Sequence, residues 1–213
     1  MSVYFYSENS VSSVATALCR MKAAAIILAA GFSSRMGRDK ALLPFGDTTA
    51  LELVVAGYAT AGVERIIVVT GQNHAALEQL SLPVELVRNP APAEGMYSSI
   101  KLGTAQLEPE LAAFFVHPVD TPLVRPETLQ TMLNCIRQGE ACSLIPCCDG
   151  KRGHPPLIAV ALRDAILGHD GSGGLRKVLA GYPQHELDLA DQGVLSGMNT
   201  LEEYQQLVRH YRR

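Results

Sequence analysis

An apolar run, 23–28, stops abruptly at a polar loop, and this junction constrains the fold more than any other part of the chain. The loop is bounded by Gly31 and Gly37, carries Arg35, and leads to Lys40. A continuous apolar run ended by glycine predicts a buried strand, and open α/β sheets bind ligands at the carboxyl ends of such strands. Small residues let backbone N–H groups approach phosphate oxygens, while arginine and lysine supply positive charge. We therefore expect a loop that binds an anionic ligand.

The spacing of this loop excludes two common phosphate-binding motifs. A Walker A loop needs Gly-x-x-x-x-Gly-Lys-Ser/Thr, whereas Gly37 is followed by Arg38, Asp39 and Lys40. A dinucleotide fingerprint needs Gly-x-Gly-x-x-Gly, and only Gly31 and Gly37 are present here. The loop is therefore a phosphate site of a third kind, and an NAD-dependent dehydrogenase is the weakest functional alternative.

Strand and helix patterns alternate along the rest of the chain, which predicts a mostly parallel sheet with helices on both faces. Periodicity, start and stop signals, and β-branched runs place the elements. The expected helices are 49–61, 74–80, 98–106 and 126–138; the expected strands are 23–28, 65–70, 84–87, 112–116, 141–146 and 157–160. We expect one three-layer α/β/α, Rossmann-like domain, and the pattern does not define its strand order.

The chain has 213 residues, enough for one large domain with a full core. Residues 1–20 are rich in serine and lack the basic start of a secretory signal, so we expect a loosely attached extension before a domain over 21–213. A formal charge of -3 without a basic stretch argues against nucleic-acid binding. No apolar run approaches membrane-spanning length.

The chain has five cysteines, an odd number, and none forms a Cys-x-x-Cys pair. This pattern disfavours a zinc site or a disulfide framework and favours a reducing, cytoplasmic location. We expect the vicinal pair Cys147-Cys148 to be buried and inert.

The first loop resembles the signature of the MobA-like NTP transferases, and above all that of the molybdenum cofactor cytidylyltransferases. The family loop reads roughly Leu-Ala-Ala/Gly-Gly-x-Ser-x-Arg-Met-Gly-x-x-Lys, and Leu28 to Lys40 match every position. The resemblance covers nearly the whole chain and implies a fold of the nucleotide-diphospho-sugar transferase type. It implies catalytic roles for Arg35 and Lys40 at a triphosphate bound by Leu28, Ala29, Ala30, Gly31, Ser33, Arg35 and Lys40.

A second apolar strand leads to Asp120-Thr121-Pro122. An aspartate at the carboxyl end of a strand can ligate Mg²⁺, which prefers oxygen and usually takes only one or two ligands from protein. The alternative is that Asp120 caps the turn before Pro122. The resembled family has Asp-x-Pro at this point, which implies that Asp120 is catalytic and binds the metal. His117 is expected to be an internal strand histidine and not a ligand.

The segment 197–203 departs from the resembled enzymes. They usually have Asp-x-Asp-Thr-Pro-Glu-Asp, so Gly197 and Asn199 replace aspartates and Leu201 replaces proline. Related sugar nucleotidyltransferases place an asparagine at the equivalent metal position, and its carbonyl oxygen can still ligate Mg²⁺. We expect Asn199 to complete the metal site. A role as cap of the last helix is the alternative, and the two are compatible.

Further segments are assigned to the cleft by the resemblance. Glu94–Ile100 resembles the Gly-Met-x-x-Ser loop against the nucleotide, although its serines could instead be helix N-caps. Gly153–Pro155 matches a Gly-His-Pro beside the acceptor, and a Gly-x-x-Gly-x-Arg stretch ends at Arg176, which is otherwise an ordinary surface arginine. The implied nucleotide-binding residues are Thr70, Gly71, Gly95, Ser98 and Ser99; the implied acceptor-binding residues are His154 and Arg176.

The resemblance implies Mg²⁺-dependent transfer of an NMP group from an NTP to a phosphorylated acceptor, with release of pyrophosphate. Ala29-Ala30-Gly31 is typical of the cytidylyl branch, where the guanylyl branch has Ala-Gly-Gly. The expected substrates are therefore CTP and molybdopterin, and a molybdoenzyme maturation partner is compatible with them. The alternatives are a sugar- or alcohol-phosphate nucleotidyltransferase and a non-catalytic nucleotide or pterin cofactor-binding protein.

Overall fold

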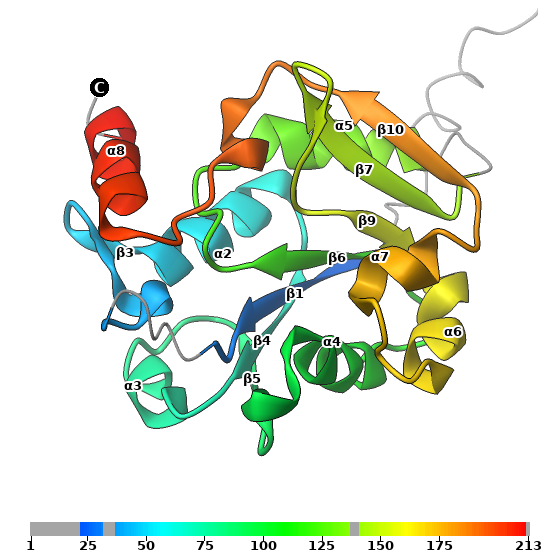
Figure 1. The fold of residues 1–213 in the computed structure, drawn as a ribbon, viewed down its shortest axis with the longest axis horizontal. Coiled ribbons are helices and arrows are strands. Elements are labelled where there is room, and N and C mark those ends of the chain that lie inside the picture. Colours follow the sequence, from blue (N-terminus) through cyan, green and yellow to red (C-terminus); the bar gives the residue numbers. More distant parts are fainter. Residues whose placement is uncertain (1–21, 32–36, 137–140, 212–213) are drawn as a thin grey trace, which may run out of the picture.

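The computed structural model describes residues 22–31, 37–136 and 141–211, and its centre is an eight-stranded sheet (Figure 1). The strand order is β10-β7-β9-β6-β1-β4-β5, with β8 paired to β7. The strands are β1 (Ala23–Ala29), β4 (Arg65–Thr70), β5 (Glu85–Arg88), β6 (Ala113–Pro118), β7 (Ser143–Cys148), β8 (Lys151–Arg152), β9 (Leu157–Ala159) and β10 (Gln184–Asp188).

The sheet is mostly parallel, as predicted. β1 pairs in parallel with β4 and β6, β4 with β5, and β7 with β10. β9 runs antiparallel between β6 and β7. The chain reaches β9 from β7 without a crossover helix, and a parallel pair would need such a connection. The short return therefore accounts for the one reversed strand of the central part.

Helices cover both faces of the sheet (Figure 1). They are α2 (Ala50–Ala61), α3 (His74–Glu78), α4 (Met96–Ala105), α5 (Pro126–Ile136), α6 (Arg163–Gly168), α7 (Gly174–Leu179) and α8 (Leu201–Tyr211). Alternate residues of β1 point to opposite faces: Ile27 joins the core under α2 and α5, whereas Ile26 joins the core under α4, α6 and α7. This burial on both sides explains why β1 is apolar without interruption.

Most element boundaries agree with the sequence prediction. The helix expected over 49–61 begins after Thr49, whose side chain forms a capping box with Glu52, and it ends at Gly62 in the left-handed conformation (φ 82°). The helix expected from Ser98 begins instead at Met96, with Gly95 as its N-cap and no side-chain cap. Ser98 and Ser99 are therefore inside α4, and the N-cap interpretation of these serines was wrong.

The last helix packs on a small hairpin formed by β2 (Pro44–Phe45) and β3 (Thr48–Thr49), which follows the 3-10 helix η2 (Lys40–Leu42) (Figure 1). The ring of Phe45 is fully buried and makes edge contacts with Tyr204 and Tyr211 of α8. The Tyr204 hydroxyl donates a hydrogen bond to the Pro44 carbonyl. Within the described residues, none of the helices combines the length and apolar character needed to cross a membrane.

Candidate functional site

The site lies where β1 and β6 end side by side. β1 is paired with β6 on one side and with β4 on the other, so the chain that leaves β1 and the chain that leaves β6 diverge at this edge. The backbone N–H of Val119 still bonds to the Leu28 carbonyl at 3.1 Å, which fixes the two strand ends to one another. Such a switch point at the carboxyl ends of parallel strands is where open α/β sheets bind ligands.

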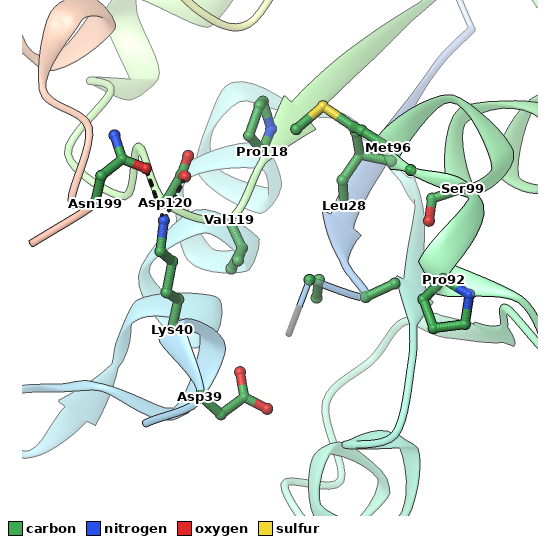
Figure 2. A pocket seen from close by; sticks show the side chains of 14 residues that line it. Leu28, Asp39, Lys40, Pro92, Met96, Ser99, Pro118, Val119, Asp120 and Asn199 are labelled. Carbon is green, nitrogen blue, oxygen red and sulfur yellow. Dashed lines mark hydrogen bonds and ion pairs between the residues drawn. The ribbon is translucent and has the colours of Figure 1, made fainter. Parts of the chain in front are cut away.

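A cavity of about 420 Å³ opens at this edge (Figure 2). The first loop forms its floor through Leu28, Ala29, Ala30 and Gly31. Lys40, Asp120 and Asn199 stand on one side, and Met96 and Ser99 of α4 face them across the opening (Figure 2). Gly95 also lines the cavity. The structure thus gathers seven of the predicted nucleotide-site positions around one opening: Leu28, Ala29, Ala30, Gly31, Lys40, Gly95 and Ser99.

Lys40 joins the two predicted metal ligands. Its ammonium nitrogen lies 2.9 Å from Asp120 Oδ2 and 2.9 Å from Asn199 Oδ1 (Figure 2). The side chains of Lys40 and Asp120 are only 17% and 24% exposed, so this ion pair is partly shielded from solvent. Lys40 begins η2, which Asp39 caps by accepting a hydrogen bond from the backbone of Ala41. The cap therefore fixes the backbone from which the ammonium reaches the two oxygens.

The donor set fits a hard divalent cation. A carboxylate oxygen of Asp120 and an amide oxygen of Asn199 approach one point, now held by the Lys40 ammonium. Mg²⁺ takes few protein ligands and completes its shell with water and substrate phosphates. In the described part of the chain, no group of three or more His, Cys, Asp and Glu side chains could hold a metal. A cation bound by both oxygens would displace the ammonium from this point.

The structure assigns the cap of α8 to Thr200 rather than to Asn199. Thr200 Oγ1 accepts a hydrogen bond from the backbone of Glu203, and the Glu203 carboxylate accepts hydrogen bonds from the backbone of Asn199 and Thr200. This reciprocal arrangement is a capping box. The Asn199 side chain is consequently available to Lys40, and the interpretation of Asn199 as a side-chain cap was wrong.

A second cavity, of about 220 Å³, adjoins the first on the side of α4 and α7. The two cavities share Leu28, Met96 and Pro118 in their walls. His154 and Arg176, the two predicted acceptor residues, both line the second cavity although they are 22 positions apart in the sequence. The rest of its wall is mostly apolar, so it suits a molecule with an apolar face and few hydrogen-bonding groups on that face.

His154 is held in place through its backbone. Its N–H donates to the Val194 carbonyl at 2.8 Å, and a Cβ at the preceding Gly153 would lie 2.3 Å from the same carbonyl oxygen. Only glycine permits this close approach. The ring opens onto the cavity, yet the surrounding protein lowers the pKa of His154 by desolvation, and the Asp120 carboxylate opposes that shift. The ring is therefore neutral at neutral pH and adds no charge to the site.

Three of the predicted nucleotide-binding residues, Thr70, Gly71 and Ser98, line neither of the two cavities. Thr70 is fully buried and bonds through its hydroxyl to His74 Nδ1 at 2.8 Å. Gly71 packs against the backbone of Ala30, where a Cβ would lie 2.7 Å from the carbonyl oxygen. Ser98 donates its hydroxyl hydrogen to the Gly95 carbonyl at 2.8 Å. These residues support the loop and strand ends that form the cavity. Ser33 and Arg35 lie outside the described residues, as does the extension 1–20.

Sequence reasoning missed several cavity residues. Asp39, Pro92, Met96, Pro118 and Val119 line the larger cavity without having been assigned to the site. Met96 carried a usable signal, because it is the methionine of the Gly-Met segment and is 59% exposed in the structure. Met96 lies where the two cavities meet and forms part of the wall of each.

His117 is an internal histidine, as predicted. Its Nδ1 lies 2.9 Å from the Tyr58 hydroxyl and its Nε2 lies 3.0 Å from the Thr121 carbonyl oxygen. Complete burial lowers the pKa of His117 to about 4. Both ring nitrogens are used within the protein, so neither is available to a metal. Cys147 and Cys148 are also buried, as expected, and burial raises the pKa of the Cys147 thiol.

Comparison with known proteins agrees with this geometry. The family model described as the MobA-like NTP transferase domain matches residues 25–188. The chain is 24% identical over 182 residues to the molybdenum cofactor cytidylyltransferase of Escherichia coli (strain K12), which covers 84% of this chain and 92% of the relative. It is 29% identical over 186 residues to a probable molybdenum cofactor guanylyltransferase of Mycobacterium avium (strain 104), covering 84% and 92%.

The chain is also similar to one further relative and to a solved structure. The chain is 29% identical over 194 residues to the nicotine blue oxidoreductase of Paenarthrobacter nicotinovorans, covering 86% of this chain and 95% of the relative. A Mycobacterium tuberculosis H37Rv protein, crystallised as a complex with manganese, superposes with a TM-score of 0.72 at 21% identity, covering 89% of this chain and 98% of that chain. Such a likeness shows the fold, and the expected nucleotide-diphospho-sugar transferase type is confirmed.

Proposed function

The chain belongs to the MobA-like NTP transferase family, and on that premise we propose that it transfers an NMP group from CTP to a phosphorylated acceptor, with molybdopterin as the acceptor that we favour. One observation carries the proposal: Lys40, Asp120 and Asn199 converge within 2.9 Å contacts at the mouth of the larger cavity. A protein that only binds a nucleotide has no need for a lysine between two oxygen donors beside the phosphates.

The chemistry requires little from the protein beyond positioning. A phosphate monoester dianion on the acceptor attacks the α-phosphorus of the NTP, a new P–O bond forms, and the bond to the β-phosphate breaks to release pyrophosphate. The attacking oxygen already carries charge, so no serine, cysteine or general base is needed. Catalysis then comes from alignment and from stabilisation of charge on the transferred group. Lys40 and Arg35 are the cations assigned to that task.

Asp120 and Asn199 would hold Mg²⁺. Bound there, the cation would neutralise charge on the triphosphate and its leaving group. The oxygen donors of the site support this assignment, as does the complex of a related structure with manganese. Because the two oxygens are now occupied by the Lys40 ammonium, Lys40 would move onto the phosphates as the cation binds. The same side chain thus serves the apo site and the triphosphate.

The second cavity is assigned to the acceptor. It adjoins the nucleotide cavity through Leu28, Met96 and Pro118, so ligands in the two cavities would meet at this shared wall. Arg176 could pair with an anionic group of the acceptor, and His154 would contact it as a neutral ring. The mostly apolar wall suits the face of a flat ring and offers few partners to the hydroxyl groups of a sugar.

The test uses the purified full chain with Mg²⁺, molybdopterin and each ribonucleoside triphosphate in turn, with pyrophosphate as the readout. We expect release with CTP above all. Release with GTP in preference to CTP would move the assignment to the guanylyl branch, which a relative at 29% identity represents. Binding of nucleotide without release, across all acceptors, would identify a binding protein and refute the transferase.

A second candidate is a nucleotidyltransferase for a sugar or alcohol phosphate. The observation that favours it is Asn199, since related sugar enzymes have asparagine at this metal position and this chain has Gly197 and Asn199 in place of two aspartates. The same assay, repeated with sugar phosphates and with alcohol phosphates such as glycerol phosphate, separates the two acceptor classes.

A further inference from the structure

The turn that carries Asp120 is closed on both sides of that residue. Thr121 bonds back to the Pro118 carbonyl twice, through its N–H at 3.2 Å and its hydroxyl at 3.0 Å. The Asp120 carbonyl accepts a hydrogen bond from the Met198 N–H at 2.9 Å, which links the turn to the segment of Asn199. The direction of the Asp120 carboxylate therefore depends on how firmly this turn is held.

His117 holds the turn from beneath. Its Nε2 lies 3.0 Å from the Thr121 carbonyl oxygen, directly after Asp120 in the chain. A carbonyl can only accept a hydrogen bond, so Nε2 carries the hydrogen and Nδ1 is an acceptor. The Tyr58 hydroxyl lies 2.9 Å from Nδ1 and must be the donor, and burial raises the pKa of Tyr58 well above its usual value. The hydroxyl thus keeps its hydrogen and fixes one neutral tautomer of the ring.

Stability of the sheet alone does not call for a histidine here. The preceding side chains of β6 are apolar, and Phe114, Phe115 and His117 are all buried. Placing an imidazole in such an environment costs free energy unless both nitrogens are hydrogen-bonded. Both are bonded here, and one of the bonds goes to the turn of the proposed metal ligand. An apolar residue would fill the space without fixing the Thr121 carbonyl.

We propose that His117, oriented by Tyr58, is a positioning residue that aims the Asp120 carboxylate at the cation site. The inference deepens the proposed function and rests on it where it names a cation. The claim that His117 restrains the turn from Pro118 to Thr121 does not depend on the proposed function, because it rests only on the hydrogen bonds. Partners behind a metal ligand commonly tune affinity in this way, and their loss costs about 10- to 100-fold in metal binding.

Two substitutions separate positioning from packing. In His117→Gln, the amide nitrogen can take the place of Nε2 and still donate to the Thr121 carbonyl. In His117→Asn, the shorter side chain takes the place of Nδ1, so it keeps a partner in Tyr58 and loses Thr121. Each variant retains one of the two hydrogen bonds of the ring. A purely structural histidine predicts equal effects of the two, whereas positioning predicts that only His117→Asn disturbs the turn.

The first readout does not depend on activity. Exchange of the Met198 amide hydrogen, followed by NMR, reports how tightly the Asp120 carbonyl is held. We expect exchange in His117→Gln to stay within about threefold of wild type and exchange in His117→Asn to be at least about tenfold faster. Tyr58→Phe keeps the ring and provides a milder second variant, with an intermediate rate, should His117→Asn fail to fold.

The second readout is Mn²⁺ binding in the presence of CTP, measured by the loss of the free-ion EPR signal. His117→Asn should weaken it by about tenfold or more, and His117→Gln should not. Met132→Ala, a buried change in α5 outside this network, controls for lost stability. Equal behaviour of the Gln and Asn variants, or a Met198 amide that exchanges alike in all variants, would overturn the proposal. Absence of pyrophosphate release by the wild type would refute only the proposed function, because amide exchange still tests the hold on the turn.

Discussion

The Lys40 ammonium lies 2.9 Å from the Asn199 amide oxygen, although the two residues are 159 positions apart. Both are brought together by the packing of α8 on the β2–β3 hairpin. Lys40 begins η2, which leads into the β2–β3 hairpin, and Asn199 lies two residues before the start of α8. The aromatic side chains of α8 pack on the hairpin residue Phe45. The contact between the two residues therefore depends on the docking of the last helix.

Replacing Lys40 by methionine should have opposite effects on metal binding and on turnover. Without the ammonium, the Asp120 and Asn199 oxygens lose their competing cation, so Mn²⁺ without nucleotide should bind at least about tenfold more tightly. Transfer should fall strongly because the triphosphate loses a cation. The same change at Lys101, which bonds to the His169 carbonyl outside both cavities, is the matched control. Turnover of Lys40→Met near that of the wild type would contradict the assignment.

The two oxygen donors should not be equivalent. Asp120→Asn removes the carboxylate that pairs with Lys40, and kcat/KM should drop by about 100-fold or more, which corresponds to about 3 kcal/mol or more of lost charge stabilisation. Asn199→Asp adds a charge at a position where the oxygen is retained, so metal affinity should rise. Steady-state kinetics over a range of Mg²⁺ concentrations distinguish the two changes. A neutral effect of Asp120→Asn would argue against a metal at this point.

Arg176→Ala should affect the acceptor and spare the nucleotide. The side chain lines only the second of the two described cavities, so KM for the acceptor should rise about tenfold while KM for the NTP stays unchanged. Arg152→Ala, at an exposed position on β8, is a control of the same type. A rise in KM for the NTP instead would contradict the assignment of Arg176 to the acceptor.

Stability should fall on acidification through His117. Its pKa is near 4 in the folded protein and 6.5 ordinarily, so the unfolded chain binds the proton first as the pH falls. The contribution is complete above about pH 6.5 and is lost between about pH 6.5 and pH 4, by roughly 3 kcal/mol in total. Urea unfolding at several pH values measures it, and His117→Gln should show a shallower decline. An equal decline in both proteins would show that other groups dominate.

Two helical glycines should respond oppositely to alanine. In α4, a Cβ at Gly103 would lie 2.4 Å from the Ile26 side chain and 3.1 Å from Val69, so Gly103→Ala should cost about 1–3 kcal/mol. In α2, a Cβ at Gly57 would lie 3.8 Å from the Val124 carbonyl, an ordinary contact, so Gly57→Ala should add about 0.5–1 kcal/mol. Chemical denaturation of both variants checks the pair.

Local sequence patterns were sufficient to predict most of the helices and strands. The apolar run into the first loop located β1 and its binding edge, and the Thr49 and Gly62 signals bounded α2 closely. The reversed direction of β9 was not predictable, since three residues of a short strand carry no sign of their pairing direction. The start of α4 at Met96 was also missed. Serines are typical N-caps and drew the predicted start to Ser98, whereas the N-cap in the structure is Gly95.

The sequence predicted those site residues that directly follow strands. It did not predict the contacts that arise only when distant segments pack together. Asp120 and Lys40 were identified from the segments after two strands, and they meet in the structure. The partnership of Tyr58 with His117 joins a helix to a strand across 59 positions, and no local pattern encodes it. The choice of Thr200 over Asn199 as cap depended on Glu203, whose carboxylate reaches back to both backbone N–H groups.

Asn199 is translated after every strand of the central sheet. The strands of the sheet are all translated by Asp188, whereas Asn199 and the helix that fixes it come last. A chain that ended at β10 would contain every strand of the central sheet together with Lys40 and Asp120, but it would lack Asn199 and α8. Under the proposed function, such a chain would have only one of the two proposed cation ligands, so we expect it to bind Mn²⁺ more weakly than the full chain does.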